Sequence, residues 1–118
     1  MNENLFSLKT EFYIGLVSKS GERIWSTDAT KDIKFIFAKH NINSFSMTAI
    51  LGFYNGEQEE ALIVTVLSVD DGDDDFPIKQ VALFDKVAEN FRTNFRQNSV
   101  LVSHSEIAGK LIEEQASD

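Results

Sequence analysis

Two arginines are the residues of this chain whose type and spacing most directly suggest chemistry. Arg92 and Arg96 lie four residues apart in an amphipathic stretch, so one face of a helix would present both guanidinium groups. Guanidinium groups pair bidentately with phosphate oxygens, so this pair could bind a phosphate. Arg23, two residues before Trp25, could add a third cation and a stacking surface. Surface salt bridges and a satellite hydrophobic contact are the commoner roles of such residues, and the sequence leaves both interpretations open.

Four aromatic residues stand where a nucleobase could stack on them. Phe12 and Tyr13 belong to a short apolar run near the start of the chain, and Phe53 and Tyr54 come directly before an Asn-Gly pair. Aromatic residues in such places more often belong to a core or an interface. Stacking therefore stays an alternative to packing.

No motif of an enzyme or of a metal site is found in the sequence. The two histidines, His40 and His104, lack metal-ligand spacing, and the chain has no cysteine. The nucleophile-elbow, P-loop and dinucleotide-binding motifs are missing as well. We therefore expect a protein that is not an enzyme, with no catalytic residue, no metal and no cofactor.

The five aspartates of residues 70–75 suggest a cation site at first sight, because hard cations prefer clustered carboxylates. The segment lacks the alternating ligands and the twelfth-position Glu of an EF-hand loop. It also precedes a helical pattern that begins at Pro77, and acidic residues are favourable at the positive end of a helix. A solvated loop is the favoured interpretation.

Charge and length limit the classes of protein. The chain has 118 residues and a net charge of −8, so general nucleic-acid binding, which needs a positive field, is not expected. Its apolar stretches are too short to span a bilayer, and its start does not resemble a signal peptide. We expect a cytoplasmic protein without a membrane contact.

The hydrophobic pattern predicts six elements. Apolar residues alternate or run together in the expected strands and recur every three or four residues in the expected helices. The pair Asn55-Gly56 favours a tight turn between the second and third strands. The expected elements are a strand over 11–18, a helix over 28–40, strands over 45–54 and 61–69, a helix over 77–97 and a strand over 100–102.

The order strand, helix, strand, strand, helix, strand predicts an α+β, ferredoxin-like βαββαβ fold. In this fold a four-stranded antiparallel sheet carries two helices on one face. We expect a single domain over residues 1–118, with its core in 11–102 and a tail over 103–118 that is a weak helix or flexible.

The other face of the expected sheet carries large apolar side chains, which favours self-association through that face or through an edge strand. A dimer is the simplest homo-oligomer that would bury them. The side chains expected on this face are Tyr13, Val17, Ile50, Tyr54, Ile63 and Leu67.

Three segments resemble a group of small phage proteins: EFYIGLVSKSGERI, FSMTAILGFYNGEQEEALIVTV, and SVLV after the second helical pattern. That group has a [FI]Y[VIF]GL strand, a helix, a strand ending in G-[FYW]-[WY]-x-G, a charged turn and an E-x-[SA]-[LV]-[IV]-V strand. The resemblance covers about residues 11–102. Its suggested functional relative is the phage Thoeris anti-defence sponge family.

Members of that family form oligomers and trap cyclic ADP-ribose signals without cleaving them, and some hold cyclic oligonucleotides from CBASS defence. The resemblance implies a non-enzymatic protein that sequesters a cyclic nucleotide at an oligomer interface in an infected bacterium. It places ligand contacts in the turn that contains Asn55, on the helix that carries Arg92 and Arg96, and at Asn98.

Two other classes of function stay open. An acidic surface could mimic nucleic acid and inhibit a basic defence protein. A small dimeric α+β barrel enzyme is the second alternative, and its proton-transfer groups would come from His40, His104, Tyr13 or Tyr54.

Overall fold

The computed structural model describes residues 5–70 and 72–114; Asp71, residues 115–118 of the expected tail and the side chain of Tyr54 lie outside the description. The six expected elements are present in the expected order. None of the helices in these two ranges is long and apolar enough to cross a membrane. The elements are β1 (Leu5–Gly15), α1 (Ser26–Lys39), β2 (Ser46–Tyr54), β3 (Glu57–Val69), α2 (Phe76–Asn94) and β4 (Leu101–Lys110).

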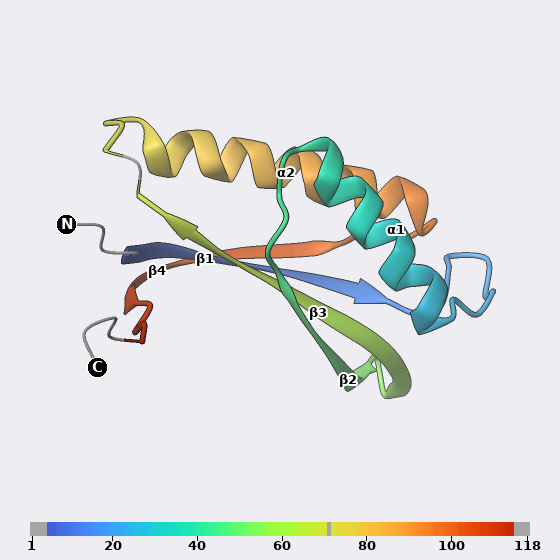
Figure 1. Cartoon of the computed structure of the whole chain (residues 1–118). Coiled ribbons are helices and arrows are strands. Elements are labelled where there is room, and N and C mark those ends of the chain that lie inside the picture. Colours follow the sequence, from blue (N-terminus) through green and yellow to red (C-terminus); the bar gives the residue numbers. More distant parts are fainter. Residues whose placement is uncertain (1–4, 71, 115–118) are drawn as a thin grey trace.

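The four strands form one antiparallel sheet in the order β2-β3-β1-β4. The central strands β1 and β3 are each flanked by an edge strand. Figure 1 shows both helices on the same side of this sheet. The α+β, ferredoxin-like class expected from the sequence is confirmed.

The core lies between the sheet and the helices. Alternate residues of β1 point toward the helices and are buried, as a period of two requires. Phe12, fully buried, is at the centre of this layer and contacts three other phenylalanine rings edge to face, at centroid distances of 5.9 Å to Phe37, 5.9 Å to Phe84 and 5.2 Å to Phe91. The core therefore joins β1 to both α1 and α2.

Three strands are longer than the sequence suggested, and one of them is β3, which begins at Glu57 instead of residue 61. β1 begins at Leu5 instead of residue 11, and β4 extends to Lys110, where a weak helix or a flexible tail was expected. The two extensions pair with each other, and on their buried face Thr10 Oγ1 lies 3.0 Å from Nδ1 of His104. These added residues are largely polar, so their hydrophobic alternation is weak and each strand depends on its partner for its conformation.

The turn between β2 and β3 has the conformation that its sequence predicts. Asn55 and Gly56 have φ angles of 52° and 80°, and both lie in the left-handed region that a two-residue hairpin of this kind requires. The turn fixes a register in which Tyr54 pairs with Glu57 and Phe53 with Gln58. Successive β3 residues from Glu57 onward therefore alternate between the two faces of the sheet.

The sheet face opposite the helices is not covered by another element of the described chain. The register places Tyr13, Ile50 and Ile63 on this face, as expected. It also carries polar groups, including Lys9 and Glu11, whose charged groups lie 3.9 Å apart. Self-association through this face stays a prediction.

Candidate functional site

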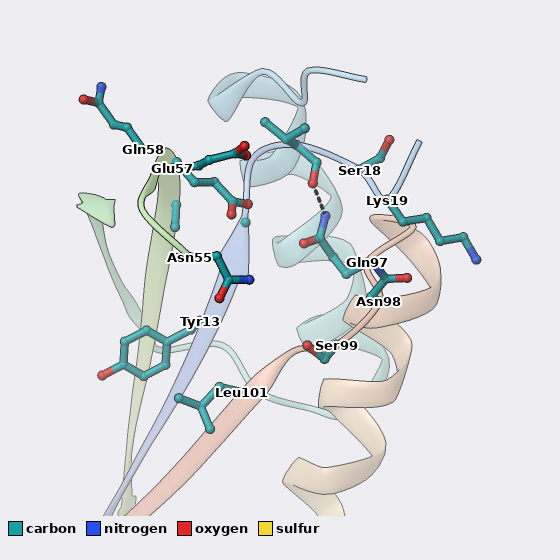
Figure 2. Close-up of a pocket in the computed structure, with 14 residues that line it drawn as sticks. Tyr13, Ser18, Lys19, Asn55, Glu57, Gln58, Gln97, Asn98, Ser99 and Leu101 are labelled. Atoms are coloured by element: carbon teal, nitrogen blue, oxygen red, sulfur yellow. Dashed lines mark hydrogen bonds between the residues drawn. The ribbon is translucent and has the colours of Figure 1, made fainter. Parts of the chain in front are cut away.

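An open groove of about 970 Å³ lies at one end of the uncovered sheet face. Four parts of the chain line it: the end of β1 with residues 17–19, the turn between β2 and β3, the first residues of β3, and the connection from α2 to β4. Figure 2 shows the residues of these segments that line it. The groove therefore collects polar residues that are far apart in the sequence.

Gln97 lies in the wall of the groove in a fixed orientation. Its side-chain nitrogen donates hydrogen bonds to the carbonyl oxygens of Val17 and Phe95, both at 3.0 Å. Carbonyl oxygens only accept hydrogen bonds, so the nitrogen must face them and the amide oxygen must face the other way. Gln97 is 7% exposed, and no donor in the described ranges reaches its Oε1. The oxygen is therefore fixed in position and accepts no hydrogen bond from the described part of the chain.

The end of α2 positions Gln97. Arg96 has a φ of 52°, and its backbone N–H donates to the carbonyl of Thr93 while that of Gln97 donates to the carbonyl of Arg92. This pair of bonds is the Schellman ending, in which a left-handed residue reverses the chain after the helix. The carbonyl of Arg96 also accepts a 2.8 Å bond from the backbone of Lys19, which ties this ending to the loop after β1.

Replacing Arg96 with Gly is expected to raise the free energy of unfolding by about 0.5–1 kcal/mol. A side chain in the left-handed region costs about 1–2 kcal/mol, and the larger chain entropy of unfolded Gly offsets part of that gain. The exposed ion pair that would be lost, Arg96 to Glu22 at 3.8 Å, contributes little. Urea denaturation would measure the change, and a lower midpoint for the variant would contradict it.

Gly15 and Glu59 form the floor of the groove beside Gln97. A Cβ atom on Gly15 would collide with the carboxylate oxygen Oε1 of Glu59 and would lie 2.9 Å from Oε1 of Gln97. The two oxygens therefore lie close together above Gly15, and the lack of a side chain there lets the Glu59 carboxylate approach the strand.

The groove is electrostatically negative. Glu57 and Glu59 both line it, and neither carboxylate has an ion-pair partner within the described residues. Lys19 also lines the groove, but Figure 2 shows its ammonium group pointing away from Asn55 and Tyr13. Such a groove favours a ligand that brings positive charge and hydrogen-bond donors.

The three arginines predicted to bind phosphate do not line the groove. Arg92 Nε donates a 2.9 Å bond to Glu89, and this hydrogen bond, more than the charge of Arg92, lowers the pKa of the Glu89 carboxyl. Arg96 pairs with Glu22. Arg23 lies 3.4 Å from the Glu60 carboxylate and 4.3 Å from the centre of the Trp25 ring. Each of the three guanidinium groups therefore has a glutamate partner within the chain.

Of the other predicted site residues, Asn55 and Asn98 do line the groove. Phe53, whose side chain is 65% exposed, is not among the residues that line the groove. Tyr54 ends β2, and its side chain is outside the description. The structure therefore brings together the two asparagines and leaves Phe53 and the arginines apart from them.

The groove also contains residues that sequence reasoning did not select, namely Glu57, Glu59 and Gln97. The first two had a usable signal. They follow the predicted Asn-Gly turn at alternate positions, which places both on one face of the returning strand. Gln97 had none, because its role depends on contacts with Val17, 80 residues away.

Neither histidine lies in the groove. His40, at the end of α1, has its Nε2 3.2 Å from the side-chain amide nitrogen of Asn90. His104 contacts Thr10 as described above, and its Nε2 lies 3.7 Å from a carboxylate oxygen of Asp85. Thr10 is fully buried, and none of these three residues lines the groove. In the acidic loop, Asp73 pairs with Lys79 at 2.7 Å, a hydrogen bond that lowers the pKa of Asp73.

No protein-family model matches the chain, and no curated protein matches its sequence. Solved structures of a phage SAM lyase are among those that match its fold. A phage SAM lyase in complex with S-methyl-5′-thioadenosine superposes with a TM-score of 0.68 at 17% identity, covering 91% of this chain and 90% of that one. A phage SAM lyase in the apo state gives 0.68 at 19% identity, covering 95% and 94%.

These matches correct two expectations. The chain shares its fold with a phage protein, but the matched protein is an enzyme, so the predicted non-enzymatic sponge for a cyclic nucleotide is overturned. The expectation that the chain is not an enzyme is overturned with it, and the matches give no support to the Thoeris or CBASS families. The groove supplies the physical reason: it offers carboxylates where a pyrophosphate would need cations.

Proposed function

We propose that this chain is an enzyme that binds S-adenosylmethionine (SAM) in the groove and cleaves it to release S-methyl-5′-thioadenosine. The observation that carries the proposal is the groove itself, which contains two carboxylates without ion-pair partners in the described chain and no inward cation. The fold shared with a phage SAM lyase supports it. SAM has a sulfonium and an ammonium group, so its positive charge suits this groove.

The cleavage that we propose breaks the bond between the sulfonium sulfur and the γ-carbon of the amino-acid part. The bonding electron pair leaves with the sulfur, which becomes the neutral thioether of S-methyl-5′-thioadenosine. A lyase adds no water, so the four-carbon fragment restores its own valence. Its carboxylate can attack the γ-carbon and close a ring, in which case no proton has to be transferred by the protein.

The contribution of the protein in this scheme is binding and orientation. An intramolecular displacement is accelerated when the reacting atoms are held in an attack geometry, because the entropy of alignment is lost before the chemical step. Such a step does not require the histidine that the groove lacks. Tyr13 and Leu101 at the lower end of the groove in Figure 2 offer surfaces for the adenosine part.

The same proposal includes a role in infection. SAM is a methyl donor, so an enzyme that degrades it inside a bacterial host deprives modification enzymes of their substrate. Loss of the methyl donor would weaken any defence that depends on methylation. We therefore place the chain among phage proteins that act against host defence by enzymatic removal of a small molecule.

Incubation of the purified chain with SAM tests the proposal. We expect S-methyl-5′-thioadenosine to accumulate in equal molar amount to the SAM consumed, as followed by liquid chromatography and mass spectrometry. S-adenosylhomocysteine is the matched control compound and should stay intact. Cleavage of its neutral thioether would have to release a thiolate, which is a far poorer leaving group than the neutral thioether that a sulfonium releases. Full recovery of SAM at micromolar enzyme would contradict the proposed function.

A further inference from the structure

We propose that Glu59 and Gln97 form a subsite above Gly15 that binds the α-ammonium group of the substrate. This inference rests on the proposed function and deepens it, because it assigns one end of SAM to one part of the groove. Glu59 and Gln97 are then positioning residues that hold the amino-acid end while the bond to sulfur breaks.

The subsite contains two side-chain hydrogen-bond acceptors. Oε1 of Glu59 and Oε1 of Gln97 converge on the space above Gly15, and no donor from the described chain reaches either of them. The Gln97 oxygen cannot turn away, since both N–H groups of its amide are bound to backbone carbonyls. Two oxygens with partial or full negative charge repel each other unless a group with several donors lies between them. An ammonium group has three donors and a positive charge.

The positive charges of the sulfonium and of the ammonium behave differently during cleavage. As the carbon–sulfur bond breaks, the charge on sulfur disappears, so a carboxylate beside the sulfur would stabilise the bound substrate more than the transition state. The charge on the α-ammonium does not change during this step. A carboxylate beside the ammonium therefore binds substrate and transition state equally and does not slow the reaction.

Gly15 borders the two oxygens of the subsite. A side chain at position 15 would displace the Glu59 carboxylate from its place beside the Gln97 oxygen, because a Cβ there would stand 2.9 Å from the Gln97 oxygen and closer to the Glu59 carboxylate. Gly15 lies in a regular strand without a positive φ, so the backbone conformation does not require glycine. The need for glycine at this position comes instead from the side-chain oxygens of Glu59 and Gln97 that lie above it.

Gly15→Ala tests the subsite. The new methyl group would meet the flexible end of Glu59, so the variant should fold. Calorimetric titration would compare S-adenosylhomocysteine, which carries the α-ammonium and is not cleaved, with S-methyl-5′-thioadenosine, which lacks the amino-acid part. We expect Gly15→Ala to weaken binding of S-adenosylhomocysteine by at least 10-fold and that of S-methyl-5′-thioadenosine by less than about 2-fold.

Gly109→Ala is the matched control, because a Cβ on this β4 residue would lie 3.7 Å from its nearest neighbour, an ordinary contact. It should bind both compounds as the wild type does. Gln97→Met, with its fold checked by thermal unfolding, should repeat the selective loss. An equal loss for both compounds in Gly15→Ala, or no loss for either, would overturn the ammonium subsite while leaving the proposed function standing. Failure of both compounds to bind the wild type would overturn the proposed function itself.

Discussion

Glu59→Gln is expected to raise the KM for SAM by about 10- to 100-fold while kcat changes by less than about 3-fold. A hydrogen bond to a charged group contributes about 1.5–3 kcal/mol, and glutamine keeps the shape of the side chain but not its charge. If Glu59 binds the α-ammonium, the lost interaction is the same in substrate and transition state, and such a loss raises KM without lowering kcat. Initial rates of S-methyl-5′-thioadenosine release over a range of SAM concentrations would measure both constants.

Glu60→Gln is the matched control for that variant. Glu60 is the next residue on β3, so its side chain lies on the other face of the sheet, where it pairs with Arg23 at 3.4 Å. Exposed pairs of this kind contribute little, and the variant should keep both kinetic constants. A collapse of kcat in Glu59→Gln with an unchanged KM would instead indicate that the carboxylate transfers a proton, which contradicts a positioning role.

The order of elements could be predicted from the sequence because it depends on local patterns. The alternation around Phe12 in β1 and the spacing of apolar residues in α2 both follow from burial against a single layer. The ends of β1 and β4 could not be predicted in the same way. Each end is stabilised by the other across the sheet, and contacts such as Thr10 with His104 join residues 94 positions apart.

The candidate site was predictable where a turn determined it. Asn55 lines the groove because the Asn-Gly turn sets the register of the hairpin, and the same register determines the face on which Glu59 lies. The position of Gln97 could not be predicted, because a non-glycine residue, Arg96, adopts the left-handed conformation that ends α2. A helical pattern does not reveal that such a residue will reverse the chain there.

The acidic partners of the arginines were not considered in the sequence prediction. The spacing of Arg92 and Arg96 was a sound reason to expect neighbouring guanidinium groups on one helix. The same spacing rule also applies to Glu89, three residues before Arg92, and the structure shows that pair formed. An acidic chain with few cations satisfies its arginines internally, and the groove is left with carboxylates.

Phe12→Ala is expected to lower the free energy of unfolding by about 3–5 kcal/mol, the usual cost of removing a buried phenylalanine ring. The ring is fully buried and contacts Phe37, Phe84 and Phe91, so its loss leaves a cavity where β1 meets both helices. Domains of this size are stable by about 5–15 kcal/mol, so the variant is expected to unfold at a much lower urea concentration. Urea titration followed by circular dichroism would measure the shift.

Phe53→Ala supplies the matched control for the core variant, because it removes the same ring from another strand of the same sheet. Phe53 is 65% exposed and should change the stability by no more than about 0.5 kcal/mol. Equal losses in the two variants would contradict the placement of Phe12 at the centre of the core.

Because Tyr13, the next residue of β1, lines the groove, a partly folded Phe12→Ala chain should also lose SAM cleavage in proportion to its unfolded fraction, with KM unchanged. A loss of activity that follows the unfolded fraction indicates a loss of folded enzyme and not a change in the groove. Phe12→Ala should therefore lower the total rate at constant KM, whereas Glu59→Gln should raise KM at nearly constant kcat.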